Sequence, residues 1–198
     1  MKLLSKAKNY EELKEIVKEN VEELAGFYLD KESLKRCFIS LNTLDQEKQN
    51  KILSVAKYID ESISIPIDTK EEKKHKINTL ATASIYYDLY EDKIKDYSEE
   101  NIVLLAHYSI VAPPDYYPNM INIFPKELLN AISETGITDF QKKEDLMLST
   151  EIILEKGKSP AEIIEYYKKQ DPDQLIAESI ELNKEYLKEE TMKAGIWK

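Results

Sequence analysis

Glycine constrains the fold of this chain more than any other residue, because only four glycines occur among 198 residues. Tight two-residue β-hairpins and glycine-rich phosphate loops both depend on glycine, which adopts positive φ angles and lets a backbone approach a ligand closely. The four positions, Gly26, Gly136, Gly157 and Gly195, instead lie near the ends of segments with helical periodicity. A glycine there can terminate a helix. The chain is therefore expected to be built from helices.

Capping patterns mark where several of these helices begin. Asn9 precedes a glutamate by three residues, and Ser98 is followed by two glutamates. The clearest starts are Ser159-Pro160-Ala161-Glu162 and Asp171-Pro172-Asp173-Gln174. Each supplies a cap, a proline at the first helical position, and a glutamate or glutamine at the third. Apolar residues recur at steps of three and four behind each start, which predicts about eight helices joined by short loops.

The predicted fold class is all-α, and two arrangements compete for the helices. Antiparallel packing around one core gives a single-domain bundle over residues 1–198, with a candidate subdivision at the proline-rich loop 113–125. The alternative is a short α-solenoid of helix hairpins, which requires a repeat of about 34–45 residues. No such period is present and the helix lengths vary. The bundle is therefore the favoured arrangement.

The charge balance argues against direct nucleic-acid binding. The chain has 38 acidic and 28 basic residues, a net charge of −10, and both of its halves are acidic. Affinity for nucleic acid rests largely on neutralising phosphates with lysine and arginine, and Arg36 is the only arginine. A weaker alternative is an accessory subunit of a nucleic-acid-processing complex. It would contact nucleic acid through a lysine-rich run, Lys70, Lys73, Lys74 and Lys76.

Cysteine usage and hydropathy bear on the compartment. Cys37 is the only cysteine, so neither an intrachain disulfide nor a zinc site with several cysteines can form. The first residues contain no apolar run of signal-peptide length, and no stretch is long and apolar enough for a membrane helix. We expect a cytoplasmic protein with no membrane association.

Residues 101–125 stand out because, with His107 neutral, Asp115 is their only charge, and they hold four of the seven prolines. One interpretation is a buried helix followed by a loop that crosses the core. The other is a recognition surface, because aromatic side chains on a proline-stiffened loop lose little entropy when they bind. The residues of that candidate interaction surface are Tyr108, Asp115, Tyr116, Tyr117, Met120 and Phe124.

His107 offers a candidate for acid–base chemistry together with Tyr108 and Asp115, because histidine titrates near neutral pH. No recognised nucleophile motif accompanies it. Glu72 and His75 match the Glu-x-x-His spacing of di-iron bundles, but the second copy that such sites need is absent. The sequence therefore predicts no catalytic residues, no metal and no cofactor.

These observations favour a non-enzymatic helical interaction protein, either an adaptor or a small subunit of a larger assembly. Its expected partner is another protein or a second copy of the chain. The nucleic-acid accessory subunit is the alternative, and an enzyme centred on His107 is the third hypothesis.

Overall fold

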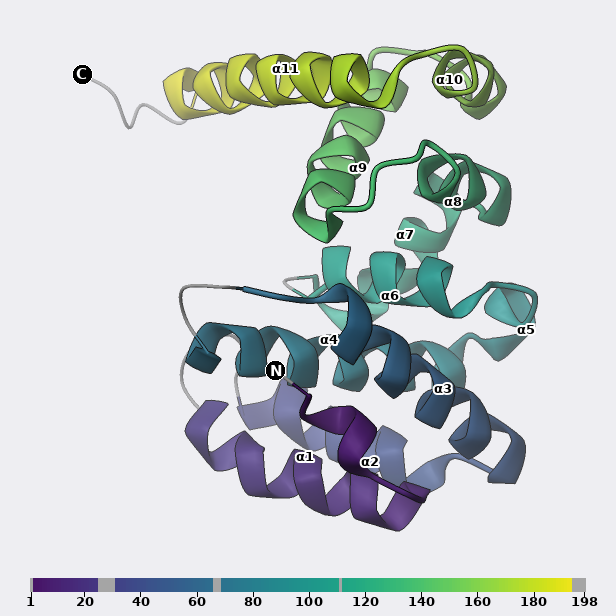
Figure 1. Ribbon diagram of the computed structural model, residues 1–198, viewed down its shortest axis with the longest axis vertical. Helices are drawn as coiled ribbons and strands as arrows, with labels where there is room; N and C mark the ends of the chain where they lie inside the picture. Colours follow the sequence, from purple (N-terminus) through teal and green to yellow (C-terminus); the bar gives the residue numbers. More distant parts are fainter. Residues whose placement is uncertain (1, 25–30, 66–68, 111, 194–198) are drawn as a thin grey trace. The chain divides into compact units, whose positions relative to one another are not determined.

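The computed structural model describes residues 2–24, 31–65, 69–110 and 112–193 (Figure 1), with the side chains of 22–24, 31–34, 36, 37 and 114 left out. Within these ranges the chain forms eleven α-helices and no strand, which confirms the all-α prediction. Two compact units are present, Met1–Phe124 (unit 1) and Pro125–Lys198 (unit 2). Gly26, Gly195 and the side chain of Cys37 fall outside the described part. The single-domain bundle stays a prediction.

Unit 1 is arranged around one central helix. Its helices are η1 (Leu4–Lys6), α1 (Tyr10–Leu24), α2 (Lys31–Thr43), α3 (Gln46–Ser62), α4 (Thr69–Leu89), α5 (Glu91–Ile94), α6 (Glu99–Tyr108), η2 (Pro114–Tyr116) and α7 (Tyr117–Ile123). Helix α4 packs against α2, α3 and α6. Because neighbours contact it on several sides, every residue from 76 to 87 is buried. The spacing of three and four that predicted the helices therefore accounts for only part of what α4 buries.

Unit 2 consists of α8 (Lys126–Ser133), α9 (Phe140–Glu155), α10 (Pro160–Tyr167) and α11 (Pro172–Lys193). Helix α11 packs against α9, which it crosses in Figure 1, while α8 contacts both α9 and α10. Short connections join the last three helices. The turn after α9 contains Gly157, whose φ of 91° lies in the left-handed region that favours glycine.

The caps predicted from the sequence hold the helix starts. Ser159 accepts a hydrogen bond from the backbone N–H of Glu162, and the Glu162 carboxylate accepts one from the N–H of Ser159. Asp171 accepts from the backbone of Asp173 at 2.9 Å. Ser98 caps α6 in the same way. Each cap satisfies an N–H group that has no partner inside its helix.

Two short helices, α5 and α7, were not predicted, and they raise the number of helices above the expected eight. Residues 117–123 are helical, so the proline-rich loop predicted at 113–125 is wrong over that stretch. Pro118 lies in the first turn of α7, where the N–H that proline lacks would have no helical acceptor. A proline at this position is therefore compatible with the helix.

None of the helices in the described ranges combines the length and the apolar character needed to cross a membrane.

Candidate functional site

The candidate interaction surface of residues 108–124 is divided between core and exterior. Tyr117, Met120 and Phe124 are buried, with 3%, 8% and 0% of their surface exposed. Tyr117 stacks on Tyr86 with ring centroids 4.6 Å apart. The core interpretation therefore holds for these three residues, whose apolar surface is already covered by the chain's own side chains.

The remaining residues of that surface differ in exposure. Tyr108 is half-buried, and its ring meets Phe124 edge-on at a centroid distance of 5.2 Å. Tyr116 has 42% of its surface exposed, and Asp115 is exposed as well. A role in binding stays a prediction for these residues.

The structure brings together the two histidines of the chain. The rings of His75 on α4 and His107 on α6 lie 5.1 Å apart, tilted by 40°. Nδ1 of His107 is 2.8 Å from the hydroxyl of Thr79, and this hydroxyl donates its single proton to the carbonyl of His75. His107 must then donate from Nδ1 to Thr79. His107 is buried whereas Asp115 is exposed. These two residues, which the sequence suggested for acid–base chemistry, therefore differ in their access to a substrate.

Two of the four lysines in the run at the start of α4 are buried. Lys74 and Lys76 are 2% and 0% exposed, and Lys74 pairs with Glu71 at 2.6 Å. Lys76 Nζ lies 2.8 Å from Oε1 of Glu72 and 3.2 Å from Oδ1 of Asp60. A phosphate backbone cannot reach these two ammonium groups. Two of the four lysines assigned to nucleic-acid contact are therefore structural.

The environment of Glu72 shifts its titration. Burial by itself would raise the pKa of this carboxyl, but hydrogen bonds from Lys76 and from the backbone of Ile65 lower it to about 2. Glu72 is therefore ionised at neutral pH. No group of three or more histidine, cysteine, aspartate or glutamate side chains in the described ranges is arranged to hold a metal.

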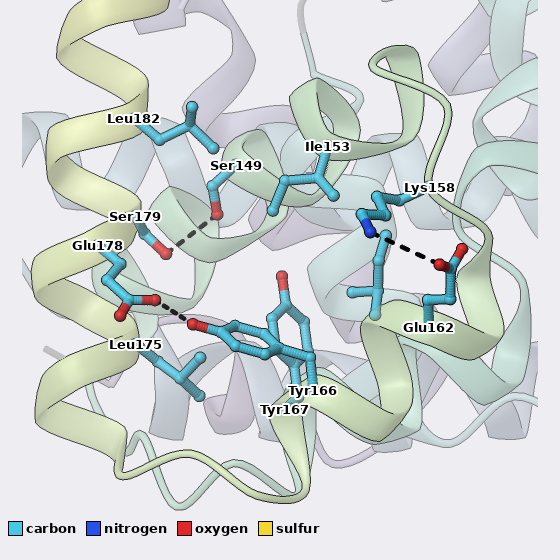
Figure 2. Close-up of a pocket in the computed structure, with 11 residues that line it drawn as sticks. Ser149, Ile153, Lys158, Glu162, Tyr166, Tyr167, Leu175, Glu178, Ser179 and Leu182 are labelled. Atoms are coloured by element: carbon cyan, nitrogen blue, oxygen red, sulfur yellow. Dashed lines mark hydrogen bonds and ion pairs between the residues drawn. The ribbon is translucent and has the colours of Figure 1, made fainter.

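A pocket lies within unit 2, where α9, α10 and α11 meet. Its volume is about 550 Å³, which falls in the range typical of ligand-binding pockets. Figure 2 shows side chains from all three helices converging on it. Its apolar walls are Ile153 from α9, Ile163 from α10, and Leu175 and Leu182 from α11.

Hydroxyl groups gather on one side of this pocket. Ser149 and Ser179 lie 3.0 Å apart (Figure 2). The hydroxyl of Thr150, just behind the lining, donates to the carbonyl of Leu146 at 2.6 Å. The phenol of Tyr167 lies 2.7 Å from Thr150 and must therefore donate to it. Burial raises the pKa of Tyr167, so its phenol stays protonated.

The lip of the pocket on the α11 side carries a carboxylate held by two neutral donors. The phenol of Tyr166 donates to Oε2 of Glu178, and the side-chain amide of Gln174 donates to Oε1 at 2.8 Å. These bonds stabilise the charged carboxylate, so the pKa of Glu178 is lowered. The same hydrogen bond, together with burial, raises the pKa of Tyr166 to about 12.

The opposite lip carries an ion pair between Lys158 and Glu162, with Nζ and Oε1 3.6 Å apart (Figure 2). Both side chains are more than half exposed. Their charges offset each other, whereas Glu178 contributes an extra negative charge. The lining as a whole is thus apolar and carries one net negative charge.

The sequence indicated the degree of burial of only two residues of this pocket, Tyr166 and Tyr167. The pair Tyr166-Tyr167 is expected to place one ring in the core and one at the rim, and the structure buries Tyr167 and leaves Tyr166 38% exposed. The pocket itself had no sequence signal, because its lining comes from three helices spread over residues 149–182. Local periodicity does not say which helix faces will meet.

Comparisons with protein-family models, with curated proteins and with solved structures found no match to this chain.

Proposed function

We propose that this chain is a non-enzymatic interaction protein, an adaptor or small subunit of a larger assembly, which binds a partner protein through the pocket of unit 2. The observation that carries the proposal is the 550 Å³ pocket with apolar walls on α9, α10 and α11. Grooves of this kind receive apolar side chains from an amphipathic partner helix. Interface energy is concentrated where such side chains fill a desolvated pocket.

The chemistry of the lining supports binding over catalysis. Both histidines and the only cysteine of the chain lie in unit 1, so the eleven residues that line the pocket include neither type. The hydroxyls of Ser149 and Thr150 are engaged with the carbonyl of Leu146. A serine nucleophile needs an adjacent general base to be activated. The lining offers none in contact with these hydroxyls.

A nucleic-acid role has less support than a protein partner. The pocket carries a net negative charge, which repels phosphate. Lys74 and Lys76 are buried and paired with acids. A salt-dependent gel shift tests this alternative directly, and we expect no binding even at low salt.

The proposed function is tested by blocking the pocket. Leu182 lines it from α11, so Leu182→Trp places an indole in the space that a partner side chain would occupy. Leu187→Trp is the matched control, because Leu187 lies on the same helix, is 57% exposed and does not line the pocket. Tagged wild type and both variants are cross-linked in lysate of the source organism, and captured proteins are identified by mass spectrometry.

We expect a protein that wild type and Leu187→Trp both capture and that Leu182→Trp loses, with circular dichroism showing all three chains folded. The purified partner should then bind wild type directly and compete with a neutral apolar dye for the pocket. Equal capture by wild type and Leu182→Trp would contradict the proposal. So would capture lost equally in both variants.

A further inference from the structure

Among the residues that the structure describes, Glu178 is the one charged group of the pocket lining without a basic side chain beside it. Its two carboxylate oxygens are each held by a neutral donor, Tyr166 on one side and Gln174 on the other. These bonds orient the carboxylate on the lip without neutralising it. A carboxylate held in this way is already positioned for a cation, which reduces the entropy lost on binding.

Three other glutamates of unit 2 each have a lysine partner close by in the sequence. Glu162 pairs with Lys158, Glu165 with Lys169 at 2.6 Å and Glu190 with Lys193 at 2.7 Å. In each pair the residues are three or four positions apart, the spacing that brings side chains together on a helix.

At the same spacings around Glu178 stand Gln174, Leu175, Glu181 and Leu182, none of them basic. Two of these, Leu175 and Leu182, line the pocket. An ionised carboxylate thus borders apolar walls on a single face of α11. A complementary surface needs an apolar group and a cation within one helical turn of each other.

We infer that the partner of this pocket is a basic amphipathic segment of another protein, which inserts an apolar side chain between α10 and α11 and pairs a lysine or arginine with Glu178. This inference rests on the proposed function. Charge complementarity supports the inference, because like charges across an interface disfavour wrong partners and opposite charges fix the register of the right one. An acidic amphipathic segment would place a carboxylate against Glu178 and be rejected.

The test uses the full chain and defined probes. An amphipathic helical peptide of leucine and lysine is compared with the same peptide carrying glutamate at every lysine, by fluorescence anisotropy at low ionic strength. N-phenyl-1-naphthylamine, a neutral dye, reports occupation of the pocket independently of charge. Glu178→Gln removes the charge while keeping the shape, and Glu178→Lys reverses it.

Glu181→Lys is the matched control, because it makes the same change in net charge on an exposed residue of α11 outside the lining. We expect the lysine peptide to bind wild type. Its affinity should be about threefold lower for Glu178→Gln and at least about tenfold lower for Glu178→Lys. Glu181→Lys should weaken binding less than about twofold. Dye binding should be equal in all four chains and lost in Leu182→Trp.

The outcomes separate the inference from the proposed function. Equal binding of the lysine peptide to Glu178→Lys and Glu181→Lys overturns the inference alone, because only overall charge would matter. Preference for the glutamate peptide also overturns it. Dye binding without binding of either peptide overturns the inference and assigns the pocket to a small apolar ligand. Self-association of the chain that is lost in Leu182→Trp also overturns it and assigns the pocket to a second copy of the chain. Absence of both dye and peptide binding refutes the proposed function itself.

Discussion

The ammonium of Lys76 lies 2.8 Å from the carboxylate of Glu72, one helical turn earlier on α4, and both side chains are buried. The same ammonium lies 3.2 Å from Asp60 on α3. Asp60 in turn accepts hydrogen bonds from the backbone of Leu3 at 2.8 Å and Ser5 at 2.7 Å. One buried lysine therefore links α4, α3 and the N-terminal segment of unit 1.

Replacing Lys76 by methionine should destabilise unit 1 strongly. The substitution keeps the apolar stem but leaves two buried carboxylates without their cation, a change that costs about 3–5 kcal/mol in buried ion pairs. Urea unfolding followed by circular dichroism measures the loss. Lys70→Met, at an exposed position of the same helix, is the control and should change the unfolding free energy by no more than about 0.5 kcal/mol. Equal effects of the two substitutions would contradict the structural role of Lys76.

The lowered pKa of Glu72 predicts a specific loss of stability in acid. A carboxyl whose pKa falls from 4.5 in the unfolded chain to about 2 in the folded chain stabilises the protein fully above about pH 5. That contribution is lost as the pH falls from about 5 to about 2. Urea unfolding of wild type and Glu72→Gln across this range isolates it. The unfolding free energies of the two proteins should converge at low pH, and a constant difference would show that Glu72 titrates normally.

Truncation of Tyr117 should destabilise the protein far more than truncation of Tyr116. Tyr117 is buried and stacked on Tyr86 at 4.6 Å, so Tyr117→Ala leaves a cavity and should cost about 3–5 kcal/mol. Tyr116 is exposed, so Tyr116→Ala should change stability by less than about 1 kcal/mol. Thermal and urea unfolding of the two single variants test this. A large loss in Tyr116→Ala would place that ring in the core.

Removing the phenol of Tyr166 should change how Glu178 titrates. The hydrogen bond from Tyr166 is the largest cause of the lowered pKa of Glu178, so Tyr166→Phe should raise this pKa toward the ordinary glutamate value of 4.5. Carbon-detected NMR of the side-chain carboxyl follows the titration directly. Tyr186→Phe, on α11 but outside the pocket lining, should leave it unchanged. An unaltered pKa in Tyr166→Phe would mean that Gln174 alone holds the carboxylate.

Sequence alone determined most of the helices and several of their ends. The caps at Ser98, Ser159 and Asp171 act within three residues of chain, and Gly157 ends α9 through its own φ angle. Such signals are local, so they can be read without knowing what packs against what. Helix α7 was missed because prolines usually end helices. Pro118 is compatible with a helix only because it lies in the first turn.

Tertiary packing decided which polar and aromatic residues are buried. Lys76 falls in a run of charges that is typical of a solvated surface, yet neighbours on several sides of α4 enclose it. Tyr116 and Tyr117 are neighbours with the same chemistry, and only their tertiary contacts leave Tyr116 exposed and place Tyr117 in the core. The pocket, assembled from residues 149 to 182, exists only once three helices pack. Hydrophobic burial is non-directional and acts between distant segments, so no local pattern encodes its outcome.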